Sequence, residues 1–361
     1  MSDASRILIV QPSWVGDAVM ATPTLRAIRE HYPSAHISYL LRRYVKPVYA
    51  GIPWADQLIT YRTGKTRAKA GKGFFDLANR LRRGKFDMAI LLPNSFKTAL
   101  VCKMAGIDRI VGYERDGRGF LISDKLLPVK DRGRFVPTPI VKYYMGIAHY
   151  LGSTHRDLKL QLFVTDHERR EAEEVLIRAG LPSTLQRPAS KGASPLVMLN
   201  PGAQYGAAKC WLPEYFAKLA DRLNSELGAT VLVSGAPKER AIIEAIQRHL
   251  THPVIDLSKL GMSLGSLKEI IRRCDLMVTN DTGPRHIAAA FDVPVVTLFG
   301  PTHPEWTEIY FDKERKAAVK VFCGPCQKKS CPLDHRCMTR LSPNAVFETA
   351  VTLLPKQPAA V

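Results

Sequence analysis

The stretch "ILIVQPSWVGDAVMATPTL", residues 7–25, sets the pattern of the fold. Its first four residues, Ile7–Val10, predict a short buried strand, and an amphipathic helix is expected from Asp17 to His31. Gly16 and Asp17 fall where the strand meets the helix. Asp17 is therefore either a capping residue or a proton acceptor in a cleft, because ligands of open α/β sheets bind beyond the carboxyl ends of the strands.

The same alternation continues through the first half of the chain. Apolar runs predict strands at 36–41 and 87–93, and helical patterns cover 74–83, 96–105 and 136–151. Apolar strands that alternate with amphipathic helices are typical of βαβ units, in which helices cover both faces of a parallel sheet.

A linker is predicted in the middle of the chain. A charged helix at 166–179 is followed by "LPSTLQRPASKGASP", residues 181–195, where Pro, Ser and Gly occur without periodicity. Beyond it the alternation restarts, with strands at 196–200, 230–235, 275–280 and 293–300 and helices at 213–227, 238–249, 282–290 and 344–354. The sequence thus predicts two Rossmann-like, doubly wound α/β domains facing a central cleft: residues 1–180 and 196–342, joined by the linker 181–195 and followed by a C-terminal helix and tail at 343–361.

Composition limits the class of protein. Apolar residues make up 46% of the chain and charged residues 24%, which describes a soluble protein with a real core. No apolar run is long enough to span a membrane, and residues 1–10 do not resemble a secretory signal. A cytoplasmic protein is expected.

The charge is strongly positive. The chain has 52 Lys and Arg against 33 Asp and Glu, a net charge of +19, and basic residues cluster at 62–85 and 109–134. Such clusters attract a nucleic acid, an anionic membrane or a phosphorylated substrate, although a solvated surface is the alternative. The sequence has no helix-turn-helix, RNP or zinc-finger pattern, so nucleic acid is the less favoured partner.

Four of the seven cysteines are clustered near the C-terminal end, in "CGPCQKKSCPLDHRC". In a reducing compartment, clustered thiols favour a structural zinc site over disulfides. Reduced thiols or a redox-labile loop are the alternatives, because the second pair is not a C-x2-C. The cysteines are Cys323, Cys326, Cys331 and Cys337, and His335 is a possible substitute ligand.

Three strand-to-helix turns of the second half indicate nucleotide binding. "NPGAQYGAAKCW", residues 200–211, places one cation, Lys209, among small residues that let backbone amides approach a phosphate. "SGAPKER", residues 234–240, contains Glu239, which suits either ribose hydroxyls or a helix dipole. "NDTGPRHIAAAF", residues 280–291, opens a helix whose first amides suit a pyrophosphate, although capping and a core histidine are the alternative. No D-x-D occurs, so a divalent metal clamp has no obvious ligands.

These motifs, together with "VGDAVMATPTLRAIREHYP", resemble the heptosyltransferases of glycosyltransferase family 9, and within it the heptosyltransferase II group. The resemblance implies a GT-B fold with an N-terminal acceptor domain and a C-terminal donor domain. It also implies an inverting transfer of L-glycero-D-manno-heptose from ADP-heptose to the lipopolysaccharide inner core, with no metal or other cofactor required for catalysis.

By the same resemblance, Asp17 corresponds to the general base, Lys209 to a contact of the donor phosphates and Glu239 to a contact of the nucleoside. The remaining donor-site positions are Gln204, Asp281, Thr282, Gly283 and His286. A phosphorylated lipid A–core acceptor at the inner membrane would suit the basic side chains of Arg62, Lys65 and Arg67, and peripheral contact with that membrane is expected.

Departures from the family pattern leave alternatives open. Gln204 stands where those enzymes commonly carry an acid, Leu212 lengthens the usual Trp-Pro step, and Arg285 replaces an apolar residue. An enzyme of the same fold with another nucleotide sugar or acceptor is the first alternative. A basic nucleic-acid-binding protein and a catalytically inactive nucleotide-binding module are the others.

Overall fold

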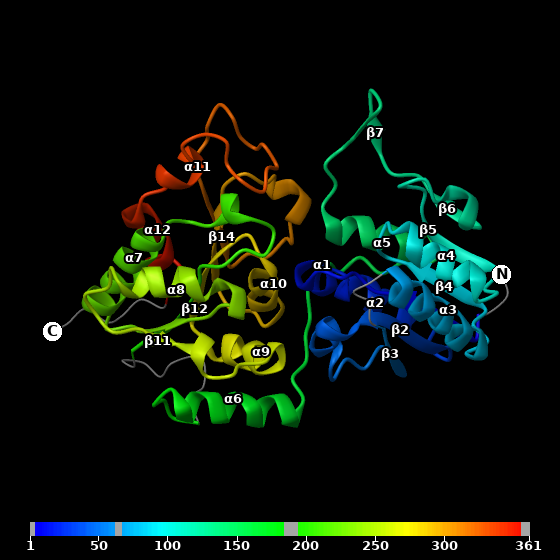
Figure 1. The fold of residues 1–361 in the computed structure, drawn as a ribbon, viewed down its shortest axis with the longest axis horizontal. Helices are drawn as coiled ribbons and strands as arrows, with labels where there is room; N and C mark the ends of the chain where they lie inside the picture. Colours follow the sequence, from blue (N-terminus) through cyan, green and yellow to red (C-terminus); the bar gives the residue numbers. More distant parts are fainter. Residues whose placement is uncertain (1–3, 62–66, 184–193, 355–361) are drawn as a thin grey trace. The chain divides into compact units, whose positions relative to one another are not determined.

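The computed structural model describes residues 4–61, 67–183 and 194–354, which form two compact units (Figure 1). The first unit comprises Met1–Phe163 with Glu305–Ile309, and the second comprises Val164–Pro304 with Tyr310–Val361. Among the described residues, no helix combines the length and the apolar character that crossing a membrane requires.

The first unit is built on a six-stranded parallel sheet with the order β3-β2-β1-β4-β5-β6. The order reverses beside β1, which is the position where open α/β sheets form their ligand sites. The strands are β1 (Arg6–Val10), β2 (His36–Arg42), β3 (Gln57–Tyr61), β4 (Met88–Leu91), β5 (Arg109–Tyr113) and β6 (Asp124–Leu126), and a short hairpin joins β7 (Lys130–Asp131) to β8 (Arg134–Phe135).

Helices cover the sheet of the first unit. They are α1 (Val15–Met20), α2 (Thr22–His31), α3 (Arg67–Arg83), α4 (Phe96–Met104) and α5 (Ile140–Tyr150), with 3₁₀ turns η1 (Arg43–Tyr49) and η2 (Gly119–Leu121). The single helix predicted at 17–31 is two helices, which meet at Ala21. Pro23 has no N–H to donate to the carbonyl of Val19, and the hydroxyl of Thr22 donates to that carbonyl instead, at 2.7 Å.

The second unit repeats the topology, with the strand order β11-β10-β9-β12-β13-β14 and parallel pairing throughout. The strands are β9 (Leu196–Asn200), β10 (Thr230–Val233), β11 (Ile255–Asp256), β12 (Leu276–Asn280), β13 (Val295–Phe299) and β14 (Glu314–Ala318). The helices are α6 (Asp166–Arg178), α7 (Pro213–Leu227), α8 (Arg240–Gln247), α9 (Leu264–Arg273), α10 (Gly283–Ala290), α11 (Arg336–Thr339) and α12 (Pro343–Val351), with 3₁₀ turns η3 (Ala207–Lys209), η4 (Pro237–Glu239) and η5 (Leu257–Lys259). A further 3₁₀ turn, η6 (Pro304–Thr307), lies mostly in the segment Glu305–Ile309 of the first unit. The prediction of two doubly wound α/β domains is confirmed.

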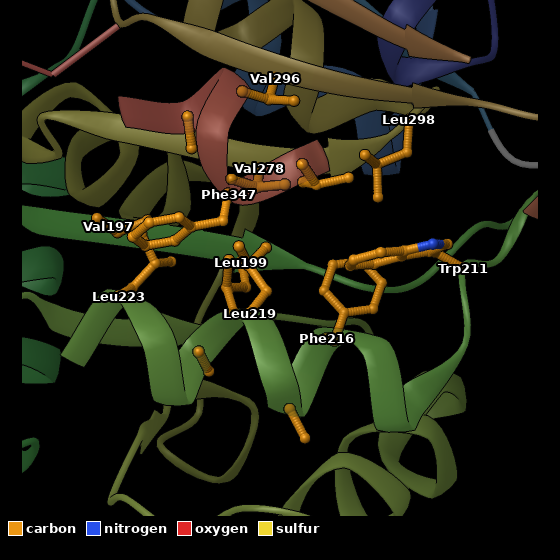
Figure 2. Close-up of a cluster of buried hydrophobic side chains, with 14 of the residues drawn as sticks. Val197, Leu199, Trp211, Phe216, Leu219, Leu223, Val278, Val296, Leu298 and Phe347 are labelled. Carbon is orange, nitrogen blue, oxygen red and sulfur yellow. The ribbon is translucent and has the colours of Figure 1, made fainter. Parts of the chain in front are cut away.

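One face of the second sheet packs against α7 and α12 (Figure 2). Phe216, Leu219 and Leu223 project from α7 at helical spacing toward the strands, and Phe347 of α12 reaches the same layer. They meet alternate residues of the central strands, Val197, Leu199, Val278, Val296 and Leu298. Burying these side chains is the main source of stability for this unit.

The charged helix α6 belongs to the second unit, whereas the sequence prediction placed residues 166–179 in the first domain. Thr165 and Glu168 form a capping box at its start. The carboxylate of Glu168 also forms an ion pair with the buried ammonium of Lys268 on α9, at 3.0 Å. This buried pair ties α6 to α9, and periodicity alone does not reveal such a partner. Most of the predicted linker, at 184–193, lies outside the described residues.

Candidate functional site

Asp17 lies in the first turn of α1, directly beyond the carboxyl end of β1. It is partly buried. Burial chiefly, and the charge of Asp17 in addition, raise the pKa of Tyr49 in η1 and of Tyr144 in α5. The carboxylate therefore lies near two buried phenols. An acid in the first turn of a helix is also favoured by the helix dipole.

The loop after β9 is held at both ends by Asn280. Its side-chain amide donates to the carbonyl of Pro201 at 2.7 Å, and its Oδ1 accepts from the backbone N–H of Trp211 at 3.2 Å. Glycine is required twice within this loop. A Cβ on Gly202 would lie 2.0 Å from the carboxyl carbon of Glu239, and one on Gly206 would lie 2.3 Å from a backbone oxygen. The sequence thus forms a tight loop (residues 201–211), which we call the donor loop because the sequence analysis expects it to contact a sugar-nucleotide donor.

The donor loop presents Lys209 to the turn after β12. The Lys209 ammonium donates to Oδ2 of Asp281 at 2.7 Å and to the backbone carbonyl of Asp281 at 2.9 Å. Both side chains are nearly buried. Burial raises the pKa of Asp281, but Lys209 and Arg285 outweigh that effect and lower it to about 2. The structure therefore brings together two residues that are 72 positions apart and were both predicted as donor-site residues.

A second ion pair lies behind the first. Arg285 donates from Nη1 to Oδ1 of Asp281 at 3.1 Å and forms a bidentate pair with Glu314 at 2.6 and 2.9 Å. Thr297 also donates to Glu314, at 2.5 Å. The sequence prediction treated Arg285 only as a departure from a family pattern. Its position four residues after Asp281, at the start of the predicted helix 282–290, is the signal that indicates a contact.

His286 is buried in the same turn. Burial, and then the positive charge of Arg285, lower its pKa to about 3, so the imidazole is neutral at physiological pH. Its Nδ1 has no hydrogen-bond partner among the described residues.

The N-terminus of α10 follows directly after the carboxyl end of β12. Thr282 is the N-cap residue, but its side chain does not cap the helix, and Gly283 begins the helix. The Thr282 hydroxyl instead accepts from the side-chain amide nitrogen of Asn200 at 3.4 Å, and Oδ1 of Asn200 accepts from the Ser234 hydroxyl at 3.1 Å. The first amides of α10 therefore lack a side-chain cap, which favours an anion at this helix end.

Glu239 and Gln204 differ in their surroundings. Glu239 accepts from the backbone N–H of Ala236 at 2.7 Å, so it closes its own 3₁₀ turn, and burial raises its pKa. Its carboxyl group also lies against Gly202 of the donor loop. Gln204 is exposed on that loop. Arg62 and Lys65 lie outside the described residues, as does the side chain of Arg67.

The cysteine segment (residues 323–337) packs on the donor loop, a contact that the sequence prediction missed. The carbonyl of Lys329 accepts from the N–H of Ala208 at 3.0 Å, and the carbonyl of Gln327 accepts from the Tyr205 hydroxyl at 2.7 Å. Nε2 of His335 lies 2.9 Å from the Ala208 carbonyl and must carry the proton there. These backbone contacts have no recognisable sequence signature.

The cysteines themselves are free thiols. Among residues 4–61, 67–183 and 194–354, no three Cys, His, Asp or Glu side chains are grouped so that they could hold a metal ion. The predicted zinc site at Cys323, Cys326, Cys331 and Cys337 is thus not supported. What the segment does in the structure is buttress the donor loop.

Comparisons with known proteins agree with this architecture. Residues 74–336 match the model of glycosyltransferase family 9 (heptosyltransferase). The chain is 31% identical to lipooligosaccharide heptosyltransferase 2 of Haemophilus influenzae over 85% of this chain and 86% of that protein. The structure of E. coli ADP-heptose lps heptosyltransferase II superposes with a TM-score of 0.74 and 26% identity, over 96% of this chain and 98% of that one. A family 9 structure from Veillonella parvula gives a TM-score of 0.81 at 22% identity, over 98% and 99%. The GT-B fold expected from the sequence is confirmed.

Proposed function

Because the chain belongs to glycosyltransferase family 9 and is therefore a glycosyltransferase, we propose that it transfers heptose from ADP-heptose to the inner core of lipopolysaccharide. The observation that carries the proposal is the pairing of Lys209 with Asp281 beside the uncapped start of α10. A cation and a helix N-terminus without a side-chain cap at one sheet edge suit the diphosphate of a nucleotide sugar. The E. coli protein of the same fold is named for the same donor and acceptor class.

In this proposal, Lys209 and the first amides of α10 stabilise the departing diphosphate. Asp281 is engaged on one oxygen by Arg285 and on the other by Lys209 and Thr302, which favours a holding role over direct contact with the donor. The diphosphate and the sugar would be contacted by Thr282, Gly283 and the neutral His286. The remainder of the donor would be contacted by Glu239 and Gln204. The positive groups belong to the chain itself, so the reaction needs no metal clamp.

Asp17 is the proposed general base. The acceptor hydroxyl attacks the anomeric carbon from the face opposite the diphosphate, a new C–O bond forms, and the bond to ADP breaks. Asp17 takes the hydroxyl proton, and the electron pair of the broken bond leaves with ADP. General base catalysis of this kind contributes roughly 10²–10⁴-fold. Its place beyond the carboxyl end of β1 supports the assignment.

The acceptor is proposed to be anionic and membrane-borne. The net charge of +19 favours phosphorylated partners. In the first unit, Leu127 and Val129 are 74% and 63% exposed beside the basic side chains of Lys130 and Arg132. Apolar and basic side chains together suit peripheral contact with an anionic membrane. Arg62, Lys65 and Arg67 remain proposed contacts of the acceptor phosphates.

The test is incubation of the purified protein with ADP-heptose and truncated core acceptors, followed by mass spectrometry of the products. A gain of one heptose per acceptor is expected, and Asp17→Asn should abolish most of it. Parallel reactions with other nucleotide sugars identify the donor. An acceptor that stays unmodified with ADP-heptose but gains another sugar would refute the proposed donor, and salt-sensitive binding of nucleic acid without any transfer would refute the enzyme itself.

A further inference from the structure

We propose that Arg285 and Glu314 are positioning residues: they fix the Asp281 carboxylate, which in turn presents the Lys209 ammonium to the donor diphosphate. The inference rests on the proposed function for the identity of the donor. It adds two side chains, neither of which was among the predicted site residues, to the machinery that holds the leaving group.

The contacts form a continuous chain from the edge of the sheet to the donor loop. Glu314 is the first residue of the edge strand β14 and lies beside Val295 of β13. Its two carboxylate oxygens are occupied by the fork of Arg285, and Thr297 donates to one of them. A bidentate pair fixes the plane of the guanidinium as well as its position. Arg285 is therefore held on one side before it contacts Asp281 on the other.

Asp281 receives a different donor on each oxygen. Oδ1 accepts from Arg285, and Oδ2 accepts from Lys209 and from Thr302 at 3.0 Å. If Arg285 were absent, Oδ1 would lose this donor, and the contacts of Lys209 and Thr302 on Oδ2 would constrain the terminal torsion less, because that torsion has a broad energy minimum. Rotation would carry Oδ2 away from the position that Lys209 now contacts. The orientation of Asp281 thus depends on Arg285.

Lys209 retains capacity for a ligand. An ammonium has three N–H donors, and two of them point to the carboxylate and the backbone carbonyl of Asp281. The third makes no hydrogen bond among the described residues, although the ring of Tyr205 lies 5.1 Å from Nζ. Lys209 keeps 9% of its surface exposed, so in this proposal an anion at the edge of the donor loop reaches the third donor. Because two of its donors are fixed, the direction of the third is fixed as well.

The charge balance of the four groups shapes the test. Lys209 and Arg285 carry two positive charges, and Asp281 and Glu314 carry two negative charges. Removing Arg285 alone strands a buried carboxylate, which is strongly destabilising, whereas replacing both members of the pair with apolar side chains is often tolerated. The informative variant is consequently Arg285→Met/Glu314→Met.

A purely structural pair would behave differently from a positioning pair. Replacement of a structural pair would act, if at all, on the thermal stability of the protein and would affect the binding of ADP and of adenosine alike. A positioning pair affects the diphosphate specifically, because Lys209 is aimed at the diphosphate and not at the nucleoside. The ratio of the dissociation constants for adenosine and ADP separates the two roles.

The experiment is isothermal titration of the full chain with ADP and with adenosine, together with a melting temperature for each variant. Arg285→Met/Glu314→Met is expected to weaken ADP binding by about tenfold, the loss of part of a charge-assisted hydrogen bond, while adenosine changes less than twofold. Arg285→Lys, with Glu314 retained, should bind ADP with an affinity between those of wild type and the double variant, because a lysine can pair with only one of the two carboxylates, Asp281 or Glu314.

The matched control is the buried Arg273–Glu269 pair of α9, whose atoms Nε and Oε1 are 2.6 Å apart. Arg273→Met/Glu269→Met should leave the adenosine-to-ADP ratio of dissociation constants unchanged, whatever its effect on the melting temperature. A folded Arg285→Met/Glu314→Met protein with the wild-type ratio would overturn the positioning role. A wild-type protein that binds ADP no better than adenosine would instead overturn the proposed donor site, so the two failures are distinguishable.

Discussion

His286 should make the second unit sensitive to mild acid. Its imidazole has an ordinary pKa of 6.5 and a pKa of about 3 in the folded protein, because burial and the neighbouring Arg285 disfavour the charged form. Between these two values the unfolded chain binds a proton that the folded chain does not. The free energy of unfolding therefore falls as the pH drops from about 6.5 toward 3 and is unaffected by this group above 6.5.

The magnitude follows from the two pKa values. Each pKa unit corresponds to about 1.36 kcal/mol, and pH 5 lies 1.5 below 6.5. His286 thus accounts for a loss of about 2 kcal/mol between pH 7 and pH 5. Asp281 adds nothing in this window, because its ordinary pKa of 3.8 and its folded value of about 2 both lie below pH 5.

The assay compares wild type with His286→Gln, which keeps a neutral polar side chain that cannot titrate. Urea unfolding is followed by the fluorescence of the buried Trp211 in a background where Trp14, Trp54 and Trp306 are phenylalanine, so that the signal reports the second unit. Wild type should lose about 2 kcal/mol more than the variant between pH 7 and pH 5, since the other histidines contribute equally to both. Equal losses, within about 0.5 kcal/mol, would refute the buried, neutral imidazole.

Three further outcomes are expected. Asp17→Asn should lower kcat by roughly 10²–10⁴-fold and leave the affinity for ADP unchanged, because the Lys209 site lies in the other unit; an undiminished kcat would exclude Asp17 as the base. Leu219→Ala should reduce the free energy of unfolding by about 2–5 kcal/mol in urea titrations, whereas Ile177→Ala, at a side chain that is 61% exposed, should change it by no more than about 0.5 kcal/mol. His335→Ala removes the N–H that donates to the Ala208 carbonyl of the donor loop, so the free energy of unfolding should fall by about 1 kcal/mol and the KM for the donor should rise in steady-state assays. An unchanged KM would show that the cysteine segment does not affect donor binding.

The parts of the fold that followed from the sequence are those with strong local signals. The helix α7 has the predicted bounds, because Pro213 begins it and Gly228, with a φ of 60°, ends it in the left-handed conformation. Most strands that were not predicted are short or polar, but β3 and β5 are five residues long, like β1, and were missed because their apolar residues are interrupted by polar residues or glycine. In β14 the sequence is Glu-Arg-Lys-Ala-Ala, which suits an exposed edge strand but has no apolar run. The break at Ala21 depends on one proline, a finer signal than the helical pattern around it.

In the candidate site, too, residues with a local sequence signal could be predicted and residues placed by long-range contacts could not. Strand-to-helix turns are visible in a sequence, so Lys209 and Asp281 could be identified before their contact was known. Glu314 could not, because it lies 29 residues from Arg285 on a strand that the pattern did not reveal. The backbone contacts of Lys329 with the donor loop depend on the path of the chain and on no side-chain type.

The position of α12 has a consequence for synthesis on the ribosome. Val346, Phe347 and Ala350 complete a layer whose other side chains come from as early as Val197. The sheet of the first unit is complete by Leu126, so a nascent chain can acquire that half early, in keeping with the N-terminal-first order of domain folding. The second unit cannot complete its core until α12 has been synthesised, some 150 residues after Val197. Until then its apolar layer stays accessible to chaperones and proteases.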